Sequence, residues 1–254
     1  MKYNIFTVLN EGYAPFGIMF THSILDVLDI DKIGNIYVYD TGLSDDSKKR
    51  IKVSKKVKIV DSGIITKSDG SVHDESWQKN VYSKARLLKH CILSQENFLP
   101  TVMVDADSIF VEEFFHLIDT SSVATLCKRS MRGRVPGHQA TSSHIGSFFS
   151  ANKNNQEVFD FLDYWIESIS KMPERDSISG AYTPKESPAL SHTYDVYKDK
   201  IKLTDLPEPV VANIELSAPP DAKIYHLKSD FRYLTVEKRV TQPRAEFYAR
   251  RYLT

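Results

Sequence analysis

The centre of the chain carries the stretch Thr101-Val102-Met103-Val104-Asp105-Ala106-Asp107-Ser108-Ile109-Phe110. Its first four residues are mostly aliphatic, and such an apolar run is typical of a buried β-strand. Side chains at i and i+2 of an extended segment point the same way, so Asp105 and Asp107 can face one point where the strand ends. Neighbouring carboxylates repel each other unless a cation lies between them. The stretch therefore outlines a metal site; the alternative is one capping aspartate and one solvated aspartate.

The composition is that of an ordinary globular domain. The 254 residues are 41% hydrophobic and 26% charged, which suits one large α/β domain with an ample core. Lys plus Arg and Asp plus Glu both number 33, so no global positive field favours nucleic acid as a partner. Residues 237 to 254 carry a local excess of cations, which indicates either a contact with anionic lipid or phosphate, or a solvated helix face.

Membrane and redox features are sparse in the sequence. The uncharged run at residues 12 to 25 is too short to span a bilayer, and we expect no signal peptide. Cys91 and Cys127 lie far apart in apolar segments. We therefore expect buried, reduced thiols in a cytoplasmic protein.

Strands and helices are expected to alternate before the Asp-x-Asp motif. The pattern predicts strands at residues 2 to 9, 35 to 39 and 57 to 60, and helices at 16 to 28, from 44 onward and at 76 to 93. This alternation implies a parallel sheet with right-handed crossovers. Ligands bind beyond the carboxyl ends of such strands, so the loops at 10 to 13, 40 to 42 and 105 to 108 should meet at one edge.

The second half of the chain is expected to complete a single domain. Helices are predicted at 110 to 118, 156 to 169 and 189 to 197, and strands at 122 to 127, 144 to 151, 201 to 203, 209 to 214 and 223 to 227. Residues 128 to 141 form a basic segment with Gly and Pro that is typical of a substrate loop or lid. We find no internal repeat and no linker, so one domain over residues 1 to 254 is expected.

A set of motifs occurs in a definite order along the chain: Tyr82-Ser83-Lys84-Ala85-Arg86-Leu87, Val102-Met103-Val104-Asp105-Ala106-Asp107, His144-Ile145-Gly146-Ser147-Phe148-Phe149 and Lys223-Ile224-Tyr225-His226-Leu227-Lys228. Together they resemble the nucleotide-sugar glycosyltransferases of the GT-A fold, most closely the branch of glycogenin and the bacterial lipopolysaccharide galactosyl- and glucosyltransferases. The resemblance covers residues 2 to 228. It implies a Rossmann-like, mostly parallel central sheet flanked by helices. It also implies a nucleotide-sugar-binding half at 1 to 110, an acceptor-side half at 111 to 228 and a basic tail at 229 to 254.

The resemblance implies that Asp105, Asp107 and His226 hold Mn²⁺ or Mg²⁺ against the donor diphosphate. A cation fixed there in advance would stabilise the charge that develops as the nucleoside diphosphate leaves. A mixed carboxylate and imidazole set suits Mn²⁺ at least as well as Mg²⁺. For His226 the alternative is a histidine satisfied within the core.

The resemblance also implies a set of donor-binding residues and, through the base, a UDP-sugar donor. Cations near the donor would meet phosphate oxygens, with a surface position as the alternative for the helical ones. The matching positions are Asn10, Glu11, Tyr13 and Asp40 for base and ribose, Asp105 with Lys228 and Arg232 for the diphosphate, and Arg86, or Lys84 as its substitute, near the donor.

Two motifs depart from the family pattern. His144-Ile145-Gly146 stands where Asn-Ser-Gly is common, and Glu186-Ser187 stands where an acidic-Gln pair is common near the acceptor. We expect Glu186 to be a catalytic or acceptor-facing carboxylate, with His192 and Asp195 behind it. In an inverting enzyme one of them would be the general base on the acceptor hydroxyl, whereas in a retaining enzyme the carboxylate would serve orientation and charge.

The expected function is therefore metal-dependent transfer of a hexose from a nucleotide sugar to a saccharide or lipid-linked saccharide acceptor. The place of action would be the cytoplasm, with a peripheral contact of the basic tail at the inner membrane face. One alternative is a non-catalytic nucleotide-sugar-binding relative of the same fold. Another is a haloacid-dehalogenase-type phosphatase with Asp105 as nucleophile and Asp107 as acid or base, although that motif normally opens its domain.

Overall fold

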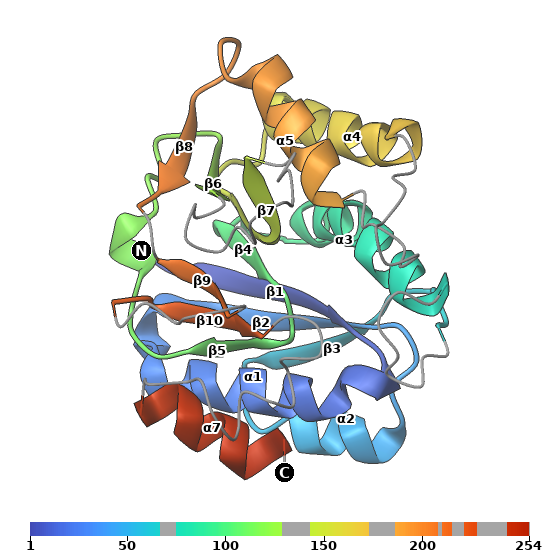
Figure 1. The fold of residues 1–254 in the computed structure, drawn as a ribbon, viewed down its shortest axis with the longest axis vertical. Coiled ribbons are helices and arrows are strands. Elements are labelled where there is room, and N and C mark those ends of the chain that lie inside the picture. The colour runs from blue at the N-terminus through green and yellow to red at the C-terminus, as the bar shows by residue number, and fades with distance from the viewer. Residues whose placement is uncertain are drawn as a thin grey trace, which may run out of the picture.

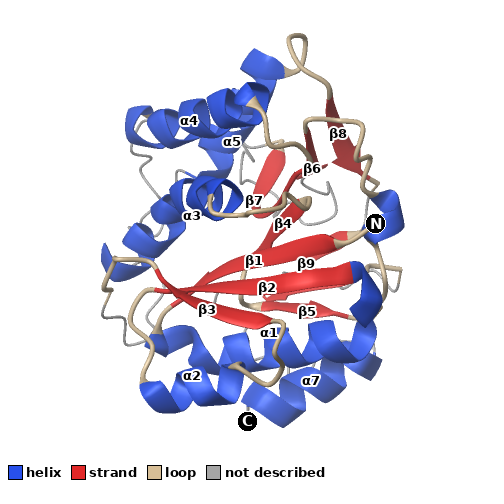
Figure 2. Ribbon diagram, turned by 180° about the vertical axis from the view of Figure 1, so that it is seen from behind, coloured by secondary structure: helices blue, strands red, loops and turns tan. Residues whose placement is uncertain are grey.

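A computed structural model of the chain describes residues 1–66, 75–128, 143–172, 186–207, 210–214, 221–227 and 243–253. It contains a large mixed sheet and a small sheet between two groups of helices. Figures 1 and 2 show α1, α2 and α7 on one side of the strands and α3, α4 and α5 on the other. None of the described helices is long and apolar enough to cross a membrane.

The N-terminal half alternates strands and helices as the sequence predicted: β1 (Tyr3–Leu9), α1 (Ala14–Val27), β2 (Ile33–Asp40), α2 (Asp45–Ile51), β3 (Val57–Asp61), α3 (Glu75–Leu93) and β4 (Thr101–Val104). The strands β3, β2, β1 and β4 lie side by side and are parallel. Ser44 caps α2, because its hydroxyl accepts a hydrogen bond from the Ser47 amide at 3.2 Å. The carboxyl ends of β1, β2 and β4 therefore form one edge of the sheet.

The large sheet continues with antiparallel β7 (His144–Ala151), followed by β6 (Ala124–Lys128) and β8 (Leu203–Leu206), which are parallel to each other. Helices α4 (Gln156–Lys171) and α5 (Glu186–Tyr197) cover this end. The pairing of β6 with β7 shifts register between Leu126 and Lys128, which marks a bulge. The bulge lies beside the Asp-x-Asp turn, because the Asp105 amide donates to the Ser147 carbonyl at 3.2 Å.

The small sheet consists of β5 (Ser108–Phe110), β10 (Ile224–Leu227) and β9 (Val211–Ile214). The predicted helix over 110 to 118 is wrong: these residues end β5 and contain a short 3₁₀ turn at Phe115–Leu117. The cause is long-range pairing, since β5 is antiparallel to β10, which follows it much later in the chain. The helix α7 (Pro243–Leu253) packs on α1 and β5.

Apolar side chains fill both faces of the large sheet. Neighbouring residues of β4 serve opposite faces, with Val104 in one cluster and Met103 in the other. On the second face Phe149, Phe161 and Trp165 pack together, and the Trp165 side chain is fully buried. Both cysteines are buried and neither forms a disulfide, as predicted.

Replacing Trp165 with Ala is expected to lower the free energy of unfolding by about 3 to 5 kcal/mol, because it removes a fully buried aromatic side chain and leaves a cavity. Replacing Phe247, whose side chain is 52% exposed, should change it by less than about 0.5 kcal/mol. Urea unfolding followed by fluorescence and circular dichroism measures both. Equal losses in the free energy of unfolding for the two variants would contradict the placement of Trp165 in the core and of Phe247 on the surface.

Candidate metal and donor site

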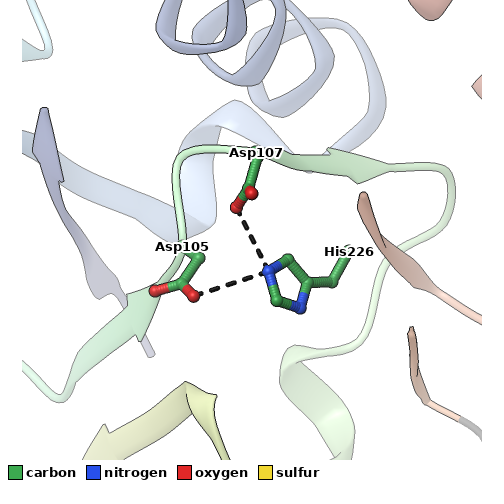
Figure 3. Close-up of side chains that lie close together, drawn as sticks. All are labelled: Asp105, Asp107 and His226. Carbon is green, nitrogen blue, oxygen red and sulfur yellow. Dashed lines mark ion pairs between the residues drawn. The ribbon is translucent and has the colours of Figure 1, made fainter. Parts of the chain in front are cut away.

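The Asp-x-Asp turn joins the two sheets, because Asp105 follows β4 of the large sheet and Asp107 precedes β5 of the small one. Antiparallel pairing places His226 of β10 opposite Ser108 of β5. The turn is tied to the same strand by the Leu227 amide, which donates to the Asp107 carbonyl at 2.8 Å. Figure 3 shows the three side chains pointing toward one another from these elements.

The three predicted metal ligands lie close enough to share one ion. His226 Nε2 is 3.2 Å from Asp107 Oδ1 and 3.5 Å from Asp105 Oδ2. One ligand atom of each residue lies within 4.8 Å of the others. Asp107 and His226 are buried, while the Asp105 side chain keeps 20% of its surface exposed. The arrangement is a partly open set of oxygen and nitrogen ligands, which suits Mn²⁺ or Mg²⁺.

A buried lysine adjoins the metal-ligand cluster. Lys84 Nζ of α3 lies 2.5 Å from Asp105 Oδ1 and 2.7 Å from Glu186 Oε1, and the side chains of Lys84 and Glu186 are each only 8% exposed. Burial alone would lower the pKa of the Lys84 ammonium, but the charges of Asp105 and Glu186 outweigh burial and raise this pKa above its ordinary value. Lys84 therefore remains a cation at neutral pH.

The charges and polar atoms of the cluster fit a divalent cation. Asp105 and Glu186 share the Lys84 ammonium, and Asp107 and His226 add a further carboxylate and an imidazole beside Asp105. Asp105 and Asp107 are close enough to repel each other, and a divalent ion between them would offset that repulsion. In addition, the hydroxyls of Ser108 and Ser147 are buried and have no hydrogen-bond partner among the described residues. Both flank the turn, one in sequence and one across the sheet.

Glu186 is held by the start of α5 and by a glycine. A Cβ atom at Gly146 would lie 2.5 Å from Glu186 Oε2, so the carboxylate occupies space that only glycine leaves free. The Ser187 hydroxyl accepts from the Gly146 amide at 2.9 Å, and Trp165 Nε1 donates to the Glu186 carbonyl at 3.2 Å. The sequence did not predict this contact between Gly146 and Glu186. The one hint in the sequence was the presence of a glycine in the motif His144-Ile145-Gly146.

A polar patch lies at the same edge of the sheet, after β1. Asn10 is 1% exposed, and its Nδ2 donates to the Thr66 hydroxyl at 3.3 Å. Thr66 in turn donates to Asn80 Oδ1 of α3 at 3.1 Å. Asn10 Oδ1 is buried without a hydrogen-bond partner among the described residues. The side chain therefore retains an acceptor for a ligand, while Thr66 and Asn80 were not predicted from the sequence.

Asp40 and Glu11 are already engaged within the protein. Asp40 Oδ1 accepts from the amides of Gly42 at 2.7 Å and Leu43 at 2.6 Å, and Oδ2 pairs with Lys48 Nζ at 2.7 Å. Glu11 accepts from the Ser44 amide at 2.7 Å and from nearby hydroxyls. A ribose at Asp40 would have to compete with these donors. Tyr13, the remaining predicted residue here, is half-buried at the start of α1.

The other predicted residues lie away from the metal-ligand cluster or outside the described residues. Arg86 is exposed, and roughly 200° of helix rotation separates it from Lys84. On α5, exposed His192 meets the Tyr164 hydroxyl at 3.2 Å, and exposed Asp195 pairs with Lys198 at 3.1 Å. The structure does not bring these three to Asp105. The following predictions lie outside the described residues: Lys228, Arg232 and residues 129 to 141 of the basic loop.

His144 is tied into a second polar contact. Its Nε2 lies 3.0 Å from Asp205 Oδ1 of β8, and its ring packs on Tyr194 with centroids 4.1 Å apart. Burial would raise the pKa of the Asp205 carboxyl, but hydrogen bonds from His144 and Lys128 bring it below its ordinary value. The departure from the family pattern at His144 is thus matched by a carboxylate that joins β7 to β8.

Comparison with solved structures finds the same fold in glycosyltransferases. An active-site mutant of LgtC matches with a TM-score of 0.64 at 10% identity, over 97% of this chain and 94% of that chain. The galactosyltransferase LgtC with donor and acceptor sugar analogs gives 0.60 at 10% identity, over 98% and 94%. The bifunctional glycosyltransferase WbbM gives 0.58 at 12% identity, over 90% of this chain and 46% of that chain. No family model and no curated protein sequence matches. The fold is therefore the GT-A fold that the sequence resemblance predicted.

Replacing Asp40 with Asn tests the charged turn after β2. Burial would raise the pKa of Asp40, but donors from Leu43, Lys48 and Gly42 lower it below the ordinary 3.8. The ionised group thus stabilises the fold above that pH by roughly 1 to 2 kcal/mol. This advantage over the Asn variant should shrink as pH falls below 3.8 and be lost as pH falls through the folded pKa. Urea unfolding across pH measures it, with exposed Asp163→Asn as the control. A pH-independent difference would contradict the assignment.

Proposed function

We propose that this protein is a metal-dependent glycosyltransferase that moves a sugar from a nucleoside diphosphate donor, a UDP-sugar, to a hydroxyl of a saccharide or lipid-linked saccharide. The carrying observation is the convergence of Asp105, Asp107 and His226 at the carboxyl edge of the parallel strands in a GT-A fold. This edge is where ligands bind in open α/β sheets. The alternative, a nucleotide-sugar-binding protein without transferase activity, would have the same fold, and the experiments below distinguish it from an enzyme.

In this proposal the chain supplies a fixed set of charges. Asp105, Asp107 and His226 would hold Mn²⁺ or Mg²⁺, which supplies positive charge for the leaving diphosphate when bound. Asp105 and Asp107 keep their geometry because backbone hydrogen bonds to β7 and β10 hold the turn. Glu186 is oriented by Lys84 before any acceptor arrives. Such preorganisation lowers the reorganisation needed when the glycosidic bond breaks.

The donor side of the proposal rests on Asn10. Its buried, unpartnered Oδ1 can accept a hydrogen bond from the N3–H of a uracil, which motivates UDP as the nucleotide. Tyr13 and Asp40 remain proposed neighbours of base and ribose. Lys228 and Arg232 remain proposed phosphate contacts, on the strength of their position after His226 in the sequence.

The acceptor side and the cellular location are proposed more coarsely. Glu186 is the carboxylate nearest to the metal ligands among the predicted acceptor-side residues, since it shares Lys84 with Asp105. Cytoplasmic action with a peripheral membrane contact is supported by α7, where exposed Phe247 lies beneath the Arg251 guanidinium at 5.7 Å. An apolar ring beside cations is a combination that anionic lipid surfaces attract.

Replacing Asp107 with Asn is expected to lower sugar transfer and metal-dependent donor hydrolysis by at least about 100-fold, because one charged ligand of the cation is lost. The assay follows UDP release from a panel of UDP-sugars with Mn²⁺, with Mg²⁺ and with chelator. Asp163→Asn on the exposed face of α4 is the matched control and should retain wild-type rates.

Full turnover by the Asp107→Asn variant in the presence of chelator would refute the metal-dependent mechanism. Tight binding of UDP-sugars by the wild-type chain without release of UDP from any donor would instead identify a non-catalytic binding protein.

Replacing Asn10 with Ala should weaken UDP binding by at least about fivefold, because the buried acceptor for the base is lost, whereas Mn²⁺ binding without nucleotide should not change. Isothermal titration with UDP in the presence of Mn²⁺ measures the affinity for UDP, and titration with Mn²⁺ alone measures the affinity for the ion. Asn35→Ala, a partly buried asparagine at the start of β2, is the control. Unchanged UDP affinity in Asn10→Ala would remove this residue from the donor site.

A further inference from the structure

A buried chain of charges connects the metal-ligand cluster to α5. Lys84 Nζ lies 2.5 Å from Asp105 Oδ1 and 2.7 Å from Glu186 Oε1, and it approaches the Gly146 carbonyl at 3.4 Å. The three charged residues come from α3, from the turn after β4 and from α5. An ion pair on the protein surface is weakened by water, but Lys84 and Glu186 are almost fully enclosed.

The two oxygens of Asp105 have different partners. Oδ1 is held by Lys84, which leaves Oδ2 directed at His226 Nε2 at 3.5 Å. Hydrogen bonds of this kind to a metal-binding carboxylate commonly set both its orientation and its affinity for the ion. The strength of the Lys84 contact is therefore a determinant of how readily Asp105 can bind a cation.

Lys84 divides its charge between Asp105 and Glu186. With Glu186 ionised, the ammonium is drawn toward both carboxylates. Without the charge of Glu186, the ammonium would pair with Asp105 alone and would compete more strongly with a cation for that carboxylate. The charge and position of Glu186 thus act on Asp105 although the two carboxylates belong to different elements.

The position of Glu186 is built into the fold. Its carboxylate covers Gly146, where any Cβ would lie 2.5 Å from Oε2 and 2.9 Å from Cγ. The backbone at the start of α5 is fixed by the Trp165 indole and by the Ser187 contact with β7. A methyl group at position 146 would therefore push the carboxylate away from Lys84 while leaving every charge in place.

We propose that Lys84 is a positioning residue through which Glu186, although not a metal ligand, sets the affinity of the Asp105–Asp107–His226 site for its divalent cation. The inference rests on the proposed function, because it assumes that these three residues bind the ion. It goes further by making the metal site dependent on α5, the helix that carries the predicted acceptor-side carboxylate. A displacement of Glu186 would thereby change metal binding.

The test is a double-mutant cycle on Mn²⁺ affinity, measured on the full chain without nucleotide by the electron paramagnetic resonance signal of free Mn²⁺. Glu186→Gln should weaken Mn²⁺ binding at least about fivefold, and Lys84→Met should strengthen it by a similar factor. In the Lys84→Met background the effect of Glu186→Gln should be at least about threefold smaller, because the shared ammonium is gone.

Gly146→Ala provides a second route that keeps all charges. It should weaken Mn²⁺ binding in the same direction as Glu186→Gln, and it should have little effect when Glu186 is already Ala. Comparing Gly146→Ala in the wild-type and Glu186→Ala backgrounds tests the inference even if Lys84→Met fails to fold. Lys89→Met and Asp163→Asn are matched controls. Lys89 of α3 and Asp163 of α4 form an ion pair at 2.6 Å on the protein surface. Both controls should stay within about twofold of wild type.

Equal effects of Glu186→Gln on Mn²⁺ affinity in the two backgrounds would overturn the inference, because charges that act independently through space give that result. Unchanged Mn²⁺ affinity in Gly146→Ala would also overturn it, because the position of Glu186 would then have no effect on the metal site. If the wild-type chain binds Mn²⁺ but the variants give either of these results, the inference fails and the proposed function is unaffected. Absence of Mn²⁺ binding by the wild-type chain would overturn the metal site and this inference together.

Discussion

The contact of the Lys84 ammonium with Asp105 and Glu186 is the interaction on which the site depends. A lysine enclosed to this extent loses most of its hydration, and only opposite charges at hydrogen-bond distance can offset that cost. Removing one member of a buried pair typically costs about 3 to 5 kcal/mol, because the other charge is left uncompensated. The same contact engages one oxygen of the metal ligand Asp105, so the stability of this region and the electrostatics of the metal ligands are linked.

The topology explains why chemistry is concentrated at this turn. The chain leaves the large sheet at Val104 and enters the small sheet at Ser108, so Asp105 and Asp107 lie where two sheets meet. The late strand β10 then pairs with β5 and brings His226 to the same point. Neither sheet alone would assemble the three ligands. The small sheet therefore has a functional as well as a structural role.

Local patterns predicted those parts of the fold that depend on local periodicity. The βαβ order and the strand ending at Asp105 follow from alternation and spacing, whereas β5 was missed because its partner β10 is distant in sequence. The contact of Lys84 with Glu186 was equally invisible, since it joins two helices far apart in the chain. One signal was available: Lys84 precedes Leu88 and Cys91 by four and seven residues, which places it on the buried face of α3 and Arg86 on the opposite one.

The departures from the family pattern become mutually consistent in the structure. A buried glutamate at position 186 requires a cation beside it and an absent side chain beneath it, and Lys84 and Gly146 provide these. A divalent ion held by Asp105, Asp107 and His226 would add a second positive charge beside the two aspartates. Because these charges lie in contact with one another, a change at one of these positions alters the electrostatic environment of all of them. The metal ligands, the lysine and the acceptor-side carboxylate are therefore best understood as one electrostatic unit.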